Sequence, residues 1–594
     1  MGINLLKFGG EFRLIRTNVI VQAALGNSFS FTPAFTQGPD PTAGSSASGF
    51  SLASFLLGTA TSGQVQIVPG VELQELYYGF YAQDDLKVAA KLTLNLGIRY
   101  EYQSPVTDRH NKLTNFDFHA ASPLTAPGLN LHGTLSFVGM GGNPRGQWNP
   151  DRDNFAPRVG FAYSLSPKTV VRAGFGIFYT PNFAYGGSGG SLDFFGLSGF
   201  SSSTAFLGTV DGITPLNFLR NPYPQGVTQP TGSSLGSATL LGQSTAFVDR
   251  NHTTPYSEQW NLNFQGEFPR SFLLQVGYVG SRGLHLYGSR VLNQLPDKFL
   301  ALRNKLLQPV SNPFFGQITT GPFSRPTISQ GQLLRPFPQF GDVTAAKSTW
   351  GSSTYHALQV SAQRRFGPGF NLTASYTWSK LIDDVTGAFA GEPLSGTGFQ
   401  DNNNLKAERS VSSLDQPHRF VVAYMWHLPL GPGARFLRQG AASRVLGGWQ
   451  VEGITTFSSG NTLGITSASN TTSSFGGGQR PNWNGRSPVL ENRSVNQWFD
   501  TSVFEQPPPF TFGNTPRTFS DLRSQGTKNF DFSAIKDTQV SERLNVQFRT
   551  EFFNLFNTVR FAPPNTSFGT PNFGVVSAQV NSPRIVQLAL KLRF

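Results

Sequence analysis

The chain has 594 residues, is rich in glycine (65), phenylalanine (54) and proline (40), and carries charge on only 13% of its positions. It has no cysteine, which excludes disulfides, cysteine-ligated metal sites and thiol catalysis. The net charge of +13 comes from 46 lysines and arginines that are scattered singly, so the sequence shows no basic stripe of the kind that binds nucleic acid. No run of about 18 apolar residues occurs, which excludes membrane-spanning helices.

Alternating apolar and polar residues predict strands that recur in pairs along the chain. Two weaker strands are predicted at about 5–14 and 19–31. Hairpins follow at 77–87 with 91–102, 158–165 with 170–179, 258–268 with 272–282, 355–366 with 370–380, 419–428 with 449–458, and 529–538 with 544–553. Together with a terminal strand, this pattern predicts about fifteen strands.

The terminal strand, residues 584–594, has two contrasting faces. One face carries Val586, Leu588, Leu590, Leu592 and Phe594, whereas the other carries Gln587, Ala589, Lys591 and Arg593. Lipid on one side and water on the other would select this pattern, although a strand of a soluble sandwich also alternates. The segment is therefore a candidate membrane-assembly strand. Whether it belongs to a membrane barrel or to a soluble sandwich depends on the pattern of the remaining hairpins.

Long stretches rich in glycine, serine, proline and asparagine separate the predicted hairpins, at about 103–157, 180–257, 283–352, 384–417, 459–528 and 554–582. Loops of this length are uncommon in compact soluble domains. Short turns that alternate with long loops are typical of outer-membrane barrels, in which the turns are periplasmic and the loops lie outside. Such barrels have even strand numbers, so a count of fifteen indicates a missed strand or a barrel that begins before this chain.

Aromatic residues occur near the predicted strand ends, where a membrane barrel places its aromatic girdles. The girdle candidates are Tyr100, Tyr102, Tyr179, Tyr376, Trp378, Trp426 and Trp449. The alternative is packing of these rings in the core of an antiparallel β protein.

No catalytic or metal-binding constellation is found. The eight histidines are dispersed, without a pair at metal-ligand spacing, and no nucleophile, base and orienting group occur together. The acidic pairs Asp84–Asp85 and Asp383–Asp384 would point to opposite faces of a strand, which favours strand-end caps over a shared site. We therefore expect no enzyme activity, cofactor or metal.

Several segments together resemble the barrel of TonB-dependent outer-membrane receptors. They include Tyr-Tyr-Gly-Phe-Tyr-Ala-Gln-Asp-Asp at 77–85 and Glu-Phe-Phe-Asn-Leu-Phe-Asn at 551–557, and also 91–101, 154–163, 374–380 and 417–420. In combination they look most like the Oar-like branch, whose full-length members carry a carboxypeptidase-regulatory-like domain before the plug and barrel. The resemblance implies a 22-stranded, plugged barrel in the outer membrane, and a terminal Phe594 read by the barrel-assembly machinery.

The sequence thus predicts an all-β protein, an antiparallel transmembrane β-barrel of the TonB-dependent receptor type with long extracellular loops. Residues 1–594 are expected to form one barrel domain that is incomplete at its N-terminus, since no signal peptide, regulatory-like domain, TonB box or plug is visible. The expected function is uptake of a large or scarce solute, such as an oligosaccharide, peptide or siderophore, with coupling to the TonB complex only if a plug is supplied. The alternatives are a passive porin-like channel or a surface-binding barrel, and a soluble β-rich adhesin is a third possibility.

Overall fold

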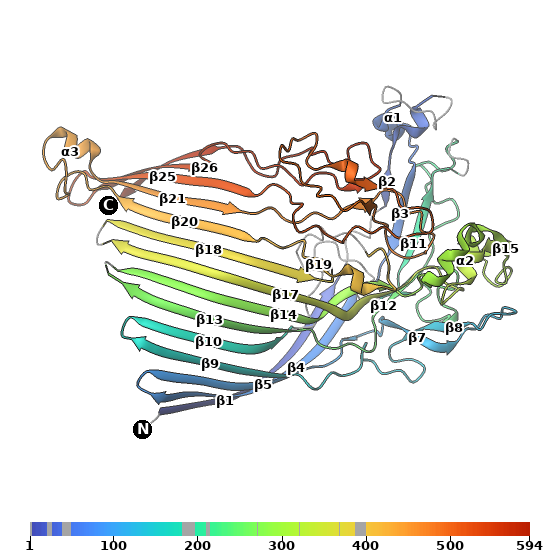
Figure 1. The fold of residues 1–594 in the computed structure, drawn as a ribbon. Helices are drawn as coiled ribbons and strands as arrows, with labels where there is room; N and C mark the ends of the chain where they lie inside the picture. The colour runs from blue at the N-terminus through green and yellow to red at the C-terminus, as the bar shows by residue number, and fades with distance from the viewer. Residues whose placement is uncertain are drawn as a thin grey trace.

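The protein is an almost entirely β structure built around one large antiparallel sheet (Figure 1). The computed structural model describes residues 3–20, 27–38, 49–180, 196–209, 214–269, 271–319, 321–366, 369–385 and 399–594. In the described residues the main sheet has 17 strands, of which fourteen are long and three are short. The short strands are β6 (Thr107–Asp108), β12 (Thr245–Phe247) and β19 (Ser410–Val411).

The fourteen long strands form a meander in which each strand pairs with the next long strand in the chain. In this order they are β1 (Ile3–Val19), β4 (Val71–Ala89), β5 (Leu92–Gln103), β9 (Phe155–Ser166), β10 (Thr169–Tyr179), β13 (Tyr256–Phe268), β14 (Phe272–Val291), β17 (Val343–Phe366), β18 (Phe370–Asp383), β20 (His418–His427), β21 (Trp449–Ser458), β25 (Thr527–Gln539), β26 (Asn545–Phe553) and β28 (Ile585–Arg593). All six predicted hairpins are present, so the all-β, antiparallel fold class is confirmed.

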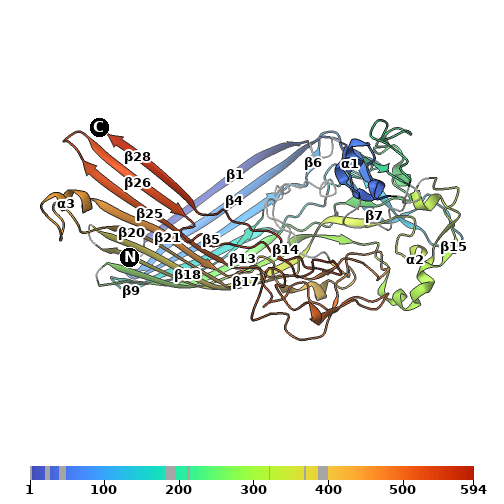
Figure 2. The same cartoon turned by 90° about the horizontal axis from the view of Figure 1, so that it is seen from above.

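The sheet curves into an open trough (Figure 2). Within the described residues, β1 pairs only with β4, and β28 pairs only with β26. These two strands form opposite rims of the trough, and both chain ends lie at the same end of the sheet (Figure 2). The described strands therefore leave a seam between β1 and β28.

The two ends of the sheet differ in their connections. At one end, which we call the turn end, most long strands are joined by short connections at 90–91, 167–168, 269–271, 367–369 and 540–544. The exception is the connection 428–448, which contains α3 (Ala441–Leu446). The other long connections emerge at the opposite end, the loop end (Figure 1). This segregation matches the predicted alternation of turns and loops.

The loops at the loop end fold into small packed units rather than structureless chain. Five hydrophobic clusters lie in or beside them, with fully buried rings such as Phe247, Phe340 and Phe499. Small sheets join β2 (Ser28–Ser30), β3 (Ser62–Ile67) and β11 (Ser202–Leu207); β7 (Thr114–Ala121) and β8 (His132–Phe137); β15 (Pro309–Ser311) and β16 (Thr327–Ser329); β22 (Thr466–Ser467) and β27 (Ser567–Phe568); and β23 (Asn482–Trp483) and β24 (Phe504–Glu505).

Helical elements at the loop end are short. They are α1 (Ser51–Leu56) and α2 (Gln330–Leu333), and the 3-10 turns Pro33–Thr36, Gly236–Ala238, Asp297–Leu307, Gly321–Ser324, Leu405–Glu408 and Thr501–Val503. Across the described ranges, no helix is long and apolar enough to span a bilayer.

One predicted strand is wrong. The segment 19–31 is not a strand of the main sheet, because Val19 ends β1 and the Ser28–Ser30 strand belongs to the separate sheet with β3 and β11; residues 21–26 lie outside the described residues. The long strands therefore number fourteen rather than fifteen. Parts of two predicted loops, 181–195 and 386–398, also lie outside the described residues.

Candidate functional site

Strand register divides the main sheet into two faces, because residues that pair directly across strands point to the same side. One face, which we call the apolar face, carries Leu588 and Leu590 at β28 and continues through Phe548, Trp426 and Phe370 to Trp378. The opposite face, the polar face, carries Gln587 and Lys591 and continues to the amides of β13–β18. Along this path apolar side chains predominate on one face and polar side chains on the other, as a wall between lipid and water requires.

The structure places the predicted assembly residues together on the apolar face of the last strand. Val586, Leu588, Leu590 and Leu592 pair with Phe552, Thr550, Phe548 and Val546 of β26. Leu588 and Leu590 are each 67% exposed, and Phe594 is fully exposed at 100%. A contiguous row of exposed leucines on one side of a strand is the surface expected to meet hydrocarbon.

All seven girdle candidates also lie on the apolar face. Trp426 and Trp449 lie near the turn end, whereas Tyr100, Tyr102, Tyr179, Tyr376 and Trp378 lie further toward the loop end. Several are partnered with other rings on this face: Phe370 packs on Trp426 with 6.4 Å between ring centroids, and the Tyr376 hydroxyl lies 2.9 Å from Nδ1 of His418. The candidates therefore lie at two levels of the apolar face.

The middle of the polar face is neutral and rich in hydrogen-bonding groups. At one level the register aligns Gln265, Gln275, Ser361, Ser375 and, across β20, Thr456. Several side chains of this wall are solvent-exposed, namely Gln275, Gln359, Gln363, Asn371, Thr373 and Ser375. We call the polar face of β13–β18 the amide wall. Such side chains can both donate and accept hydrogen bonds without imposing a fixed charge.

Ion pairs on the polar face lie near the two rims of the trough, and the exposed Arg172 and Arg419 lie on the same face directly beside the amide wall. Beside β1, Arg99 lies 2.6 Å from Glu101 and 3.1 Å from Glu11, and Lys7 lies 2.7 Å from Asp85. Beside β28, Arg549 lies 3.7 Å from Glu452 and 3.4 Å from Glu551. Each sector is largely self-neutralised, so neither presents an uncompensated field of one sign.

Buried ion pairs join the loops to one another and to the strands. Arg480 and Glu408 are 2.6 Å apart, and Arg523 and Asp415 are 2.7 Å apart. Arg517, which is fully buried, binds Asp383 at the end of β18. Sequence reasoning missed these groups, because the partners lie 72 to 134 residues apart and no local motif marks them.

The acidic pairs differ in their roles. Asp383 and Asp384 do end β18, and Asp384 accepts hydrogen bonds from the backbone N–H and hydroxyl of Ser352. Asp85 instead lies within β4, where it accepts hydrogen bonds from Lys7, Gln83 and Asn95. The prediction of a strand-end cap is therefore wrong for Asp85. Over the described part of the chain, no group of three or more histidines and acidic residues could hold a metal ion.

A cationic and aromatic cluster lies where loops meet the wall at the loop end. The Lys347 ammonium lies 4.6 Å from the Tyr287 ring centroid and 5.3 Å from that of Trp148. His252 stacks on Trp148 at 4.5 Å, and its Nε2 shares a hydrogen bond of 3.1 Å with the Tyr287 hydroxyl. Burial, and next the nearby Lys347 charge, lower the pKa of His252 to about 3. His252 is therefore neutral at physiological pH and packs within the folded loops at the loop end, which we call the loop cap.

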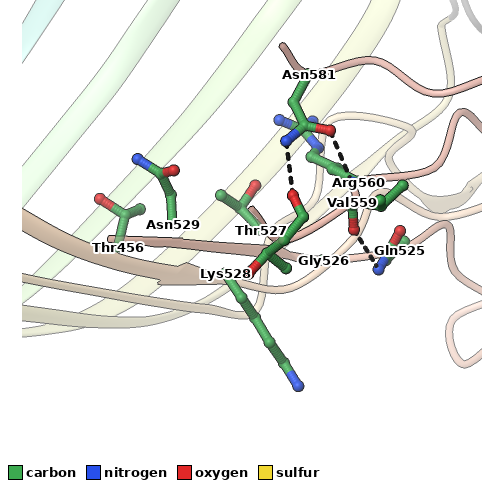
Figure 3. Close-up of a pocket in the computed structure, with 10 residues that line it drawn as sticks. Thr456, Gln525, Gly526, Thr527, Lys528, Asn529, Val559, Arg560 and Asn581 are labelled. Carbon is green, nitrogen blue, oxygen red and sulfur yellow. Dashed lines mark hydrogen bonds between the residues drawn. The ribbon is translucent and has the colours of Figure 1, made fainter. Parts of the chain in front are cut away.

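A cavity of about 330 Å³ opens beside β21 and β25 at the loop end (Figure 3). Its lining includes Thr456 and Asn529 from the polar face and Arg560 and Asn581 from the last long loop. Asn581 accepts a hydrogen bond from the Arg560 backbone and donates one to Thr558. Lys528 points away from these groups (Figure 3). The cavity is thus a small recess at the mouth of the polar face, without a convergent set of charges.

Comparisons with known proteins agree with this geometry. A family model described as an outer membrane beta barrel domain matches residues 1–587. No curated protein matches the sequence. Among solved structures, the chain is similar to the outer membrane transporter YddB from Escherichia coli, with 9% identity and a TM-score of 0.44 over 90% of this chain and 47% of that chain.

Two further solved structures show a similar degree of likeness. The pyoverdine outer membrane receptor FpvA from Pseudomonas aeruginosa PAO1 has 11% identity and a TM-score of 0.38, covering 89% of this chain and 43% of that chain. The ferric-catecholate import receptor Fiu from K12 E. coli has 11% identity and a TM-score of 0.37, covering 88% and 45%. The chain thus spans less than half the length of these three proteins. On the family match over residues 1–587, the chain belongs to the outer membrane beta barrel domain family and is an outer-membrane protein.

Proposed function

We propose that residues 1–594 form one barrel domain of an outer-membrane transporter, the barrel of a TonB-dependent receptor of the Oar-like branch. The transport proposal rests on the amide wall. This wall is a solvent-exposed, hydrogen-bonding surface on the face opposite the apolar side chains. A barrel that served only as an anchor would gain nothing from such a surface, whereas a path for hydrophilic solutes needs it.

The chemistry of the wall favours a hydrophilic solute that is rich in hydroxyl groups, such as an oligosaccharide. Amide and hydroxyl side chains such as Gln275, Gln359 and Ser375 can replace the hydration shell of hydroxyl groups in either hydrogen-bonding sense. The arginines of the two charged sectors are paired with carboxylates, whereas Arg172 and Arg419 add exposed cations beside the wall.

Energised uptake is part of the proposal because the resemblance in segments such as 77–85 and 551–557 is to TonB-dependent receptors. Coupling would require a plug that contacts the TonB complex. Three of the structurally similar proteins are a transporter and two receptors by name. Enzyme activity is not part of this proposal.

Uptake in cells tests the transport proposal. A strain that lacks the gene should lose uptake of one oligosaccharide from a panel, and the gene supplied in trans should restore it. A Gln359→Glu/Ser375→Glu variant, which places two carboxylates on the amide wall, should lower the rate for neutral sugars. Thr377→Ser on the same wall is the matched control. Unchanged uptake of every solute in the knockout would contradict the proposal.

The second candidate function is a passive channel, which the exposure of the polar face over the described residues also favours. The two are separated by repeating the uptake measurement in a strain without TonB. Energised uptake should vanish there, whereas passive entry should persist and should follow the solute gradient. In proteoliposomes, a passive channel alone should give steady conductance and swelling with neutral sugars.

A further inference from the structure

One connection at the turn end differs from all its described neighbours. The connections at 90–91, 167–168, 269–271 and 540–544 are short, but β20 and β21 are joined by residues 428–448. This segment, which we call the turn-end arm, contains α3 and projects beyond the strands (Figure 1). The meander requires only a tight turn at this position. The additional residues therefore call for a separate explanation.

The arm is tied to the apolar face of the sheet. Lys536 donates from Nζ to the carbonyl oxygens of Arg444, Val445 and Gly447 at 3.0, 2.9 and 2.7 Å. Trp449 donates from Nε1 to the Val445 carbonyl at 3.2 Å. Lys536 and Trp449 pair directly across β21 and β25, and both point to the apolar face. The C-terminal half of the arm is thus fixed on the lipid side of the wall.

Exposed apolar side chains recur along the arm. Val445 is 63% exposed and Phe436 is 52% exposed, and Leu437 and Leu446 are also exposed. Backbone hydrogen bonds hold the arm in a defined shape: the N–H of Gly431 donates to the Phe436 carbonyl, that of Phe436 to the Pro429 carbonyl, and that of Gly447 to the Ser443 carbonyl. Gly431 has φ +106°, and a Cβ there would lie 2.5 Å from the Gly447 Cα, so both ends of the arm pack closely. These apolar groups are therefore displayed by a folded segment.

The charge of the arm has one sign. Arg435, Arg438 and Arg444 are exposed, and no aspartate or glutamate occurs from residue 428 to residue 448. Arg435 lies over the Phe436 ring, 5.3 Å from its centroid, which places a cation beside an exposed aromatic group. Apolar side chains next to cations form the pattern of a segment that lies in the interface of an anionic membrane.

We propose that the turn-end arm is an interfacial anchor that binds anionic phospholipid headgroups of the inner leaflet of the outer membrane. Phe436, Val445 and Leu446 would enter the region below the headgroups, while the three arginines contact lipid phosphates. The lipid is the favoured occupant because the arm continues the apolar face beside Trp426 and Trp449, where hydrocarbon meets headgroups. This inference depends on the outer-membrane barrel but not on transport.

The absence of cysteine makes the test direct, because an introduced cysteine can be labelled uniquely. The full-length Val445→Cys variant is labelled with a nitroxide and inserted into two kinds of vesicle. One contains phosphatidylethanolamine with phosphatidylglycerol, and the other contains phosphatidylethanolamine with phosphatidylcholine. The ratio of collisions with oxygen to collisions with a water-soluble nickel complex reports lipid contact. Glu542→Cys, on the exposed 540–544 turn at the same end, is the aqueous control, and Leu590→Cys reports that the barrel itself is inserted.

The proposal predicts a high oxygen-to-nickel ratio at residue 445 with phosphatidylglycerol and a low ratio at residue 542. Arg435→Gln/Arg438→Gln/Arg444→Gln should reduce the lipid-bound fraction, with each arginine contributing about fivefold to the binding equilibrium. Arg543→Gln, an exposed cation on the control turn, should leave it unchanged. High salt should release the wild-type arm, which gives a second test if the triple variant inserts poorly. The proposal would be overturned if the label at residue 445 collided mainly with nickel in both kinds of vesicle. It would also be overturned if lipid contact did not depend on phosphatidylglycerol, on salt or on the three arginines.

Discussion

Arg480 and Glu408 form an ion pair inside the loop cap, with 2.6 Å between Nη2 and Oε1 and side chains that are 2% and 0% exposed. The two residues come from loops that follow different hairpins and lie 72 positions apart. Burial is the main cause that raises the pKa of Glu408, and the Arg480 charge opposes it. The pair therefore fixes two loops to each other, and their mutual contact, with a backbone hydrogen bond and the nearby Arg517 charge, opposes the cost of burying the carboxylate.

Removal of one partner of this pair should loosen the cap. Arg480→Met leaves Glu408 buried without its counter-charge and should destabilise the cap by about 3 to 5 kcal/mol. The measurement is hydrogen exchange of amides in 399–417 and 478–482, while exchange in the strands should not change. Glu408→Leu/Arg480→Met should recover much of the loss, and Lys406→Gln, an exposed change in the same 3-10 turn, should be neutral. Slow exchange in Arg480→Met equal to that of the wild type would contradict this role.

The buried His252 should make the loop cap sensitive to acid. Its pKa is lowered from 6.5 to about 3, mainly by burial, so the folded chain stays neutral at this site while the unfolded chain binds a proton below pH 6.5. Stability is thus fully present above pH 6.5 and is lost progressively as the pH falls toward 3, with an upper limit on the order of 5 kcal/mol. Lys347, Tyr287 and Trp148 surround the ring, and a proton there would face the Lys347 cation.

Thermal unfolding of the cap at several pH values checks this expectation. The wild type should lose stability between pH 6.5 and pH 3 more steeply than His252→Gln, which cannot take up the proton. His119→Gln, a change of an exposed histidine in another loop, should retain the wild-type slope. Equal pH profiles for wild type and His252→Gln would show that His252 does not control the acid response.

The strands could be predicted from the sequence because alternation is a local signal. The hairpin 258–268 with 272–282 begins two residues earlier in the structure and extends to Val291, and the strand at 449–458 has the predicted bounds. The side-chain faces of β28 followed from the same period of two. The predicted strand at 19–31 was wrong because alternation marks a strand without saying which sheet it joins. Ser28–Ser30 pairs with β3 in a small sheet of the loop region.

The interior of the loop cap could not be predicted, because its contacts join distant segments. Arg517 reaches Asp383 across 134 positions, and neither residue lies in a motif that indicates the other. The neutrality of the amide wall was visible only after register aligned Gln265 with Gln275 and Ser361. Alternation therefore specifies which face a residue occupies, whereas tertiary pairing decides which residues meet.

The last strand offers a matched test of the two faces. Leu588→Arg places a cation on the apolar face of β28, which should destabilise the membrane-embedded fold by about 2 to 4 kcal/mol if this level is near the bilayer midplane. Ala589→Arg adds the same side chain on the polar face, beside Arg549 and Glu551, and should have a much smaller effect. Unfolding in urea from detergent or lipid, followed by the shift in gel mobility on heating, measures both. Similar losses for the two variants would contradict the assignment of the faces.

The exposed Phe594 should matter for assembly more than for the stability of the finished barrel. Its side chain is 100% exposed and packs on no neighbouring group that would lose contacts on its removal. Deletion of Phe594 should therefore slow membrane insertion by the assembly machinery in cells, whereas Phe594→Trp, which keeps a terminal aromatic ring, should insert normally. Once inserted, the deleted protein should unfold at the same urea concentration as the wild type. Normal amounts of heat-modifiable, membrane-embedded protein after the deletion would show that the terminal ring is not an assembly signal in this chain.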